Sequence, residues 1–274
     1  MSTTSRIDRR FAALKAAGRP ALIPFMTAGD PDPALTVPAL HALVSAGADL
    51  IELGMPFSDP MADGPVIQQA NERAIAKGVG LKHVLDSVRS FRAQDGDTPL
   101  VLMGYLNPIE QYGREAFVAD AATAGADALL VVDCPIDESA ELGGLLAPQG
   151  LKQIHLVAPT TSMVRQQRIA AAAQGFLYYV SFKGITGAAR LEAGPVRQVV
   201  EGLKRLTSVP VCVGFGVRDA DSAGALGAFA DGVVIGSALV EQMAGATDAA
   251  DLGQRIAGFL GPIRAALERV PLAA

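Results

Sequence analysis

Glu52 and Asp63 are the two residues whose types and surroundings best suit acid–base chemistry. Glu52 interrupts an apolar run just before the C-terminal end of that run. A carboxyl group in apolar surroundings has a raised pKa, because burial disfavours its charged form, and it then exchanges protons near neutral pH. Asp63 lies on the long loop that follows and could fold back over the same position. A structural interpretation stays open, in which Glu52 pairs with an Arg or Lys and Asp63 only shapes an Asp-Gly turn.

A second group of residues is suited to binding phosphate. Three glycine-bearing loops occur in order along the chain, at Gly184–Gly187, Gly214–Gly216 and Gly236-Ser237. Glycine lets the backbone approach a ligand closely, and backbone N–H groups at the start of a helix bind anions. Ser237 could add a hydroxyl donor and begin a short helix over Ala238–Met243. The alternative is that these are ordinary turn glycines.

Aromatic and aliphatic residues near the ends of apolar runs could line a slot for a flat apolar ring. Tyr178 could also offer a hydroxyl group close to Glu52. For any one of these residues, a place in the hydrophobic core is the competing interpretation. The candidates are Phe25, Tyr105, Leu130, Tyr178, Phe215 and Ile235.

The elements that would position these residues are short apolar strands alternating with amphipathic helices. Nearly continuous apolar runs are typical of parallel strands buried on both faces. Helices are expected between them, for example at Ala34–Ala46, Val84–Ala93, Arg114–Ala124 and Val196–Arg205, with one more from about Asp251 to Arg269. The expected strands are Leu22–Met26, Leu50–Leu53, Leu100–Met103, Ala128–Val132, Gln153–Val157, Phe176–Val180, Val211–Val213 and Gly232–Ile235.

Eight such strands separated by helices favour a closed (β/α)8 barrel of the TIM type over an open sheet. A weak repeat supports this fold, since Ala48-Asp49, Ala126-Asp127 and Ala230-Asp231 each introduce a strand. The chain has 274 residues and no long linker, so we expect a single domain over residues 1–274. In such barrels the chemistry sits at the C-terminal ends of the strands, where Glu52 and the glycine loops fall.

Composition excludes several classes of function. The net charge of -5 argues against a nucleic-acid surface. The two cysteines cannot build a disulfide scaffold, and the three histidines, His41, His83 and His155, form no metal-binding motif, so no metal site is expected. The N-terminus lacks the apolar core of a signal peptide, and no run is long enough to span a membrane. We therefore expect a cytoplasmic protein.

The segment around the two carboxylates resembles the signature of tryptophan synthase α subunits at every fixed position. Further similarity runs along the whole chain, including Pro24–Pro31, Tyr105–Pro108, Asp133–Pro135, Gly184–Gly187, Gly214–Val217 and Gly236-Ser237. The segment itself reads Glu52-Leu53-Gly54-Met55-Pro56-Phe57-Ser58-Asp59-Pro60-Met61-Ala62-Asp63-Gly64-Pro65.

This resemblance implies a lyase that splits indole-3-glycerol phosphate into indole and glyceraldehyde 3-phosphate. It makes Glu52 the catalytic acid and base, and Asp63 the carboxylate that binds the indole N–H. Retro-aldol cleavage needs C3 of the indole protonated and the adjacent glycerol hydroxyl deprotonated, and an ionised Asp63 would stabilise charge on the ring nitrogen. The substrate-binding positions implied are Phe25, Tyr105, Tyr178, Thr186, Gly187, Phe215, Gly216, Gly236 and Ser237.

The resemblance also implies a partner, a β subunit that carries pyridoxal phosphate (PLP) and receives the indole. No cofactor is expected on this chain, and the expected assembly is a heterotetramer of two α and two β subunits. The positions placed at the interface are Asp59, Pro60, Asn107 and Pro135. One departure is the pair Phe182-Lys183, where the family frequently has Arg followed by a small residue, so the role of that Arg does not transfer.

Two other functions compete with this expectation. A phosphate-binding barrel of another kind, such as an isomerase of phosphorylated sugars, would share the glycine loops but not the whole segment from Glu52 to Pro65. A regulatory protein that binds indole phosphates without turnover has little need for both Glu52 and Asp63.

Overall fold

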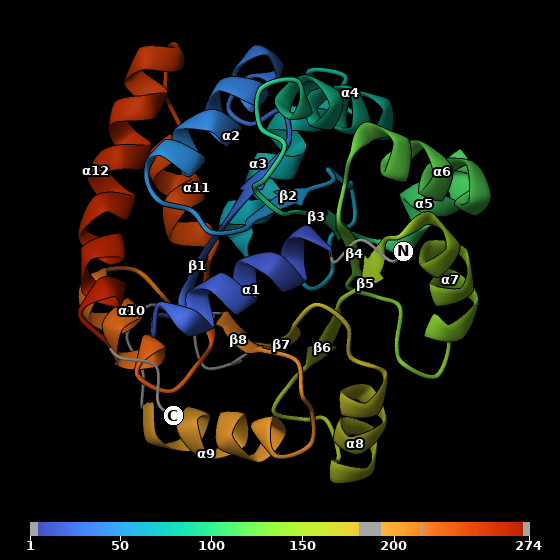
Figure 1. The fold of residues 1–274 in the computed structure, drawn as a ribbon. Coiled ribbons are helices and arrows are strands. Elements are labelled where there is room, and N and C mark those ends of the chain that lie inside the picture. The colour runs from blue at the N-terminus through green and yellow to red at the C-terminus, as the bar shows by residue number, and fades with distance from the viewer. Residues whose placement is uncertain (1–4, 181–192, 215, 271–274) are drawn as a thin grey trace.

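The chain folds into a ring of parallel strands surrounded by helices (Figure 1). A computed structural model describes residues 5–180, 193–214 and 216–270. The hydrogen-bonded order is β5-β4-β3-β2-β1-β9-β8-β7-β6. The strands are β1 (Ala21–Thr27), β2 (Ile51–Gly54), β3 (Leu100–Gly104), β4 (Ala128–Val131), β5 (Lys152–Gln153), β6 (His155–Val157), β7 (Leu177–Val180), β8 (Val211–Gly214) and β9 (Gly232–Ile235).

Closure of the ring depends on one stretch of chain that changes neighbours. The expected strand Gln153–Val157 is divided into β5, which pairs with β4, and β6, which pairs with β7. Only Ile154 separates the two, and its N–H donates to the carbonyl of Leu129 at 2.9 Å. The nine strands therefore occupy eight positions, and the expected single-domain (β/α)8 barrel is confirmed.

The expected helices are present, one of them (Arg114–Ala124) with the expected bounds and the others with shifted ends, and further helices join them. Ala34–Ala46 becomes a short 3-10 turn, η1 (Pro33–Leu35), followed by α2, and the C-terminal helix is α12. Helices α1 and α3 were not among the predicted segments. The α-helices are α1 (Arg6–Ala16), α2 (Thr36–Ser45), α3 (Pro65–Ala76), α4 (Leu81–Arg92), α5 (Leu106–Tyr112), α6 (Arg114–Ala124), α7 (Ser139–Leu146), α8 (Met163–Ala172), α9 (Ala193–Lys204), α10 (Ala220–Gly227), α11 (Ser237–Met243) and α12 (Ala249–Glu268).

Alternate residues of each strand face either the barrel interior or the surrounding helices. Leu22 and Leu53 belong to the large core between strands and helices, whereas Ile23 and Leu50 belong to the interior cluster. Both faces are apolar because both are buried, which explains the continuous apolar runs in the sequence. Whether a residue faces the interior thus depends on its odd or even position along the strand. An interior residue near the C-terminal end of a strand could contact a ligand.

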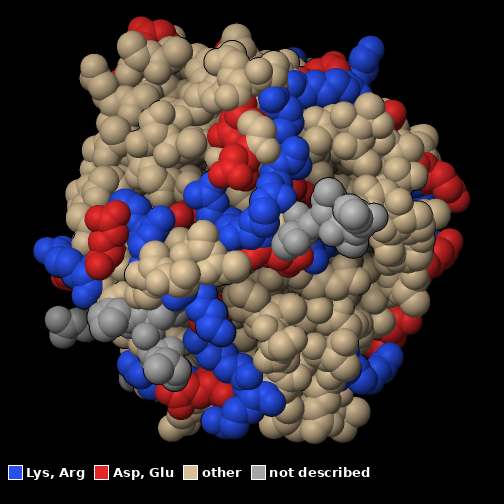
Figure 2. Space-filling model, in the orientation of Figure 1, with Lys and Arg blue, Asp and Glu red and all other residues tan. Residues whose placement is uncertain are grey.

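Helix α1 lies across one opening of the ring (Figure 1). Its buried side chains, Ile7, Phe11 and Leu14, belong to the interior cluster, and the rings of Phe11 and Phe176 lie 5.9 Å apart. Charged side chains gather over α1 on this face (Figure 2), and its ion pairs include Arg6–Asp127 and Arg10–Asp97. The helix therefore covers the end of the barrel opposite the expected site.

The three Ala-Asp repeats share one structural role. Each aspartate precedes a strand, and its carboxylate accepts the N–H of the first or second residue of a neighbouring strand. Asp49 accepts from Leu22, Asp127 from Leu100 and Asp231 from Val211, at 2.8–2.9 Å. Each also pairs with basic side chains, which are Arg19 and Arg264, Arg6 and Arg92, and Lys204 respectively.

We predict that Asp127→Ala lowers the free energy of unfolding by about 3–5 kcal/mol, because it removes the nearest carboxylate partner of the buried Arg92. Asp127 is 6% exposed and accepts from Arg92 at 2.7 Å. Asp137 is the matched control, since it also pairs with two arginines, Arg165 and Arg168, but in an exposed setting. Asp137→Ala should leave stability nearly unchanged. Urea denaturation measures both, and equal losses would contradict the assigned role of Asp127.

Candidate active site

Glu52 lies inside the barrel as the ionisable member of a layer with two apolar neighbours. Its neighbours in register are Phe25 on β1 and Val101 on β3. The side chain is fully buried, and neither carboxylate oxygen has a hydrogen-bond partner among the described residues. Among the described residues, Glu52 therefore pairs with no Arg or Lys.

Burial raises the pKa of Glu52 to about 8. The cause is the loss of hydration of the charged form, and no cation among the described residues offsets that loss. The group is consequently protonated at neutral pH and can give up its proton within the range in which enzymes work. The strand position that directs a carboxyl group inward thus also tunes it for proton transfer.

Asp63 is half-buried and is held by the helix that follows it. Its backbone N–H donates to the carbonyl of Pro60 at 3.0 Å, and its own carbonyl accepts from Nε2 of Gln68 at 2.8 Å. Nδ2 of Asn71 lies 3.5 Å from Oδ2 of Asp63. Burial raises the pKa of Asp63 to about 6, and hydrogen bonds from Tyr105 and Asn71 oppose that rise. At neutral pH this carboxyl group is therefore ionised while Glu52 is not.

Residues 55–64, the loop between β2 and α3 that carries Asp59 and Asp63, form the acidic loop. Tyr105, which directly follows β3, contacts this loop. Its hydroxyl accepts the N–H of Ala62 at 3.1 Å, and its ring lies 5.4 Å from that of Phe57. Burial and the charge of Asp63 raise the pKa of Tyr105, so its hydroxyl stays neutral. The described contacts of Tyr105 are thus with the loop that carries Asp63.

Two glycines at strand ends make room for the aromatic residues expected in the site. A Cβ atom on Gly54 would lie 2.6 Å from the Phe25 ring, and one on Gly214 would lie 2.1 Å from the Tyr178 hydroxyl. Tyr178 is buried, and its pKa is raised by burial and by the nearby Glu52. The hydroxyl of Tyr178 therefore lies within electrostatic reach of Glu52, as the sequence suggested.

The other apolar candidates divide between the two faces of the barrel. Leu130 is in the interior cluster, as a residue lining the slot should be. Ile235 packs in the core between strands and helices, so its predicted place in the slot is wrong. Ile67 on α3, not predicted, packs against Phe25 instead. Its position three residues after Gly64 gave no signal that the helix turns this side chain toward the barrel.

At the predicted phosphate end, Gly236 precedes helix α11, which begins at Ser237 as expected. A Cβ atom on Gly236 would lie 3.7 Å from both Ile67 and Phe25, which brings this loop beside the apolar slot. Gly216 has a φ of 82°, a conformation that favours glycine. The predicted residues Thr186, Gly187 and Phe215, with Lys183, lie outside the described residues.

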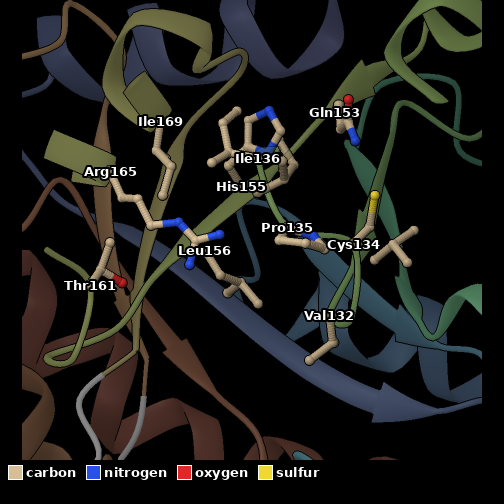
Figure 3. A pocket seen from close by; sticks show the side chains of 12 residues that line it. Val132, Cys134, Pro135, Ile136, Gln153, His155, Leu156, Thr161, Arg165 and Ile169 are labelled. Atoms are coloured by element: carbon tan, nitrogen blue, oxygen red, sulfur yellow. The ribbon is translucent and has the colours of Figure 1, made fainter. Parts of the chain in front are cut away.

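A separate cavity of about 150 Å³ lies between the loop after β4, strand β6 and helix α8 (Figure 3). Pro135, His155 and Arg165 are among its lining residues, and neither Glu52 nor Asp63 is. Small-molecule sites usually measure about 300–1,000 Å³. The cavity is smaller than that range, and its lining residues show that it is distinct from the site built around the two carboxylates.

Comparison with known proteins identifies the family to which these features belong. The family model described as tryptophan synthase alpha chain matches residues 11–263. The tryptophan synthase alpha chain of Laribacter hongkongensis (strain HLHK9) is 55% identical over 264 residues, which cover 96% of this chain and 99% of that one. The chain belongs to the tryptophan synthase alpha chain family.

Two further relatives agree with this assignment. The alpha chain of Thioalkalivibrio sulfidiphilus (strain HL-EbGR7) is 54% identical over 265 residues, covering 96% of this chain and 100% of that one. The crystal structure of tryptophan synthase subunit alpha from Legionella pneumophila str. Paris superposes with a TM-score of 0.91 at 42% identity, covering 98% of this chain and 100% of that one.

The family assignment confirms the expected function, a lyase of tryptophan biosynthesis that cleaves indole-3-glycerol phosphate. An alpha chain is one part of a larger enzyme, so membership also implies a β subunit as partner. Of the predicted interface positions, Asp59, Asn107 and Pro135 are exposed. Pro60 is buried, and its carbonyl accepts from Asp63, so its described contacts shape the acidic loop.

Residues 5–180, 193–214 and 216–270 contain neither a metal-binding cluster nor a membrane-spanning helix. In these ranges no group of three or more His, Cys, Asp or Glu side chains is arranged to hold a metal ion. None of the helices described there is both long and apolar enough to cross a bilayer. His41 and His83 lie in helices α2 and α4, and His155 lies in β6.

Proposed function

We propose that Glu52 and Asp63 are the catalytic pair for retro-aldol cleavage of indole-3-glycerol phosphate. The observation that carries this proposal is the fully buried Glu52 carboxyl group, which has no partner among the described residues. Retaining such a group costs stability, because burial opposes its ionisation. A lyase that must move a proton inside an apolar slot has a use for it.

In the proposed reaction, protonated Glu52 donates its proton to C3 of the indole. The resulting carboxylate then accepts the proton of the hydroxyl on the carbon attached to C3. The bond between that carbon and C3 breaks, its electron pair returns to the indole ring, and the hydroxyl carbon becomes the aldehyde of glyceraldehyde 3-phosphate. Glu52 ends the cycle protonated, so no net proton is consumed.

Asp63 is proposed to act by charge. Protonation of C3 places positive charge on the ring nitrogen, and an ionised carboxylate beside the indole N–H stabilises that charge. The pKa of about 6 keeps Asp63 ionised at neutral pH, when Glu52 is still protonated. Two carboxyl groups with different surroundings thus take opposite roles.

The remaining site residues are proposed as substrate contacts. Phe25 and Tyr178 would hold the indole ring from the barrel interior, and Tyr105 would close the slot on the side of the acidic loop. Gly216, Gly236 and Ser237 would bind the phosphate, together with Thr186, Gly187 and Phe215. The closeness of Gly236 to Phe25 supports a substrate that spans from an apolar slot to this loop.

We propose that the chain works without a cofactor of its own. The retro-aldol step needs proton transfer and charge stabilisation, which two carboxyl groups can supply. PLP would reside only on the β subunit, where indole is consumed. The chain is proposed to act in the cytoplasm, where free thiols such as those of Cys134 and Cys212 are stable.

The proposed assembly is a heterotetramer of two α and two β subunits, and indole passes from one to the other. Asp59 and Pro135 are exposed on the loops that follow β2 and β4, and Asn107 is exposed in helix α5, which follows β3. The end of the barrel that carries these loops also carries Asp63. A partner bound there would cover the site and touch the acidic loop, in which Pro60 has a buried position.

The pH dependence of the lyase should be bell-shaped. We expect kcat/KM to rise with pH as Asp63 ionises near pH 6 and to fall as Glu52 loses its proton near pH 8.

Glu52→Gln should fold normally and lower indole release by about a hundredfold or more, because it removes the proton transfer. Indole release measured from pH 5 to 9 checks both. Near-normal turnover in Glu52→Gln would disprove the proposed role.

The β subunit should accelerate the lyase by ordering the acidic loop. Coupling between sites is typically about 1–3 kcal/mol, or roughly 5- to 150-fold, and we expect an acceleration within or above that range. Asp59→Ala should weaken the acceleration more than the basal rate, since Asp59 is exposed and outside the proton path. Indole release with and without partner measures this. A partner that binds but leaves wild-type turnover unchanged would show that this is a stand-alone lyase.

A further inference from the structure

Helix α3 fastens two loops of the barrel mouth to each other. On one side Arg73 donates to both carboxylate oxygens of Asp30 at 2.7 and 3.0 Å, and Lys77 donates to the carbonyl of Pro31 at 2.8 Å. On the other side Gln68 and Asn71 donate to Asp63. The helix is therefore anchored to the loop after β1 while it also holds Asp63, which directly precedes its N-cap residue, Gly64.

Gln68 and Asn71 reach Asp63 from the same face of the helix, because residues three apart are neighbours on a helix surface. Gln68 holds the backbone carbonyl of Asp63, whereas Asn71 lies against the carboxylate itself. Asn71 is only 4% exposed and sits on the same buried side of α3 as Ala70 and Ala74. A buried amide costs free energy unless it has a partner, and the described partner of Nδ2 is Oδ2 of Asp63.

We propose that Asn71 is a positioning residue for Asp63, which with Tyr105 keeps the carboxylate ionised and aimed at the indole nitrogen. This proposal rests on the role assigned to Asp63 in the proposed function. Two donors on different elements, Tyr105 after β3 and Asn71 on α3, hold the carboxylate. Because Arg73 ties α3 to Asp30, the position of Asn71 does not depend on the acidic loop. The Asn71 amide can therefore hold the Asp63 carboxylate in place when the loop moves.

A donor beside a carboxylate favours its ionised form, so loss of the amide has a consequence that depends on pH. The hydrogen bond from Asn71 is one of two that oppose the effect of burial on the pKa of Asp63. The titratable groups among the described residues that act on this site are Tyr105 and Tyr178 and, through these tyrosines, Asp133, Glu52 and Cys212. Both tyrosines have raised pKa values and stay neutral, so Asp63 alone should give the acidic limb.

The test compares Asn71→Leu, which removes the donor at similar size, with Asn71→Asp, which puts a second carboxyl group beside Asp63. The matched control is Gln69→Leu, an exposed amide on the same helix. The measurement is kcat/KM for indole-3-glycerol phosphate from pH 5 to 9. We expect the acidic limb to move up by about one pH unit in Asn71→Leu, or about tenfold in rate at pH 5, with near-recovery at pH 8. Asn71→Asp should move it further, because like charges oppose ionisation.

Three results would overturn the proposal. An unshifted acidic limb in Asn71→Asp is the first, and this nearly isosteric variant also serves if Asn71→Leu fails to fold. The second is a uniform loss at every pH, which would give Asn71 a packing role only. The third is an equal shift of the limb in Gln69→Leu.

Asp63→Asn, measured in parallel, separates this proposal from the one on which it rests. If Asp63→Asn keeps near-normal activity and its acidic limb, the role of Asp63 fails, and the role of Asn71 fails with it. If Asp63→Asn is inactive while both Asn71 variants keep the wild-type pH profile, only the positioning role of Asn71 fails.

Discussion

A carboxyl group inside an apolar barrel, with no described partner, is the constraint around which the mouth of this protein is arranged. Glu52 cannot be ionised there without a large cost in free energy, because neither hydration nor a cation in the described part of the chain offsets the charge. Its neighbours on the same layer are Phe25 and Val101, and helix α1 covers the opposite end of the ring. The apolar surroundings that raise the free energy of the ionised Glu52 carboxylate are the same ones that make the protonated group a proton donor near neutral pH.

Asp63 shows how the fold gives a second carboxyl group a different state. It lies on a half-buried loop, and hydrogen-bond donors on two elements oppose the effect of burial. The pKa of Asp63 is therefore raised less than that of Glu52. These donors need fixed supports, which are the strand before Tyr105 and a helix tied to Asp30 by Arg73. The separation of the two pKa values thus depends on packing well beyond the two carboxylates.

The sequence was enough to predict the barrel and the apolar surroundings of Glu52, because both depend on local pattern. Strands buried on both faces give continuous apolar runs, and a charge within one of them stands out. The same continuity hides which face a residue takes, and for this reason Ile235 was wrongly placed in the slot. The division of the fifth strand at Ile154 and the contacts of Ile67 and Asn71 depend on neighbours distant in the chain, which no local pattern reveals. The roles of Thr186, Gly187 and Phe215 stay predictions.

The most direct test of this account is an infrared titration of the Glu52 carboxyl group. The carbonyl stretch of a protonated carboxyl group, taken as the difference between wild type and Glu52→Gln, reports the protonated fraction of this one side chain at each pH. The account predicts that this signal is present at pH 7 and is lost with a midpoint of about 8. A midpoint close to the ordinary glutamate pKa of about 4.3 would contradict it, because Glu52 would then be ionised at neutral pH and unable to donate the first proton.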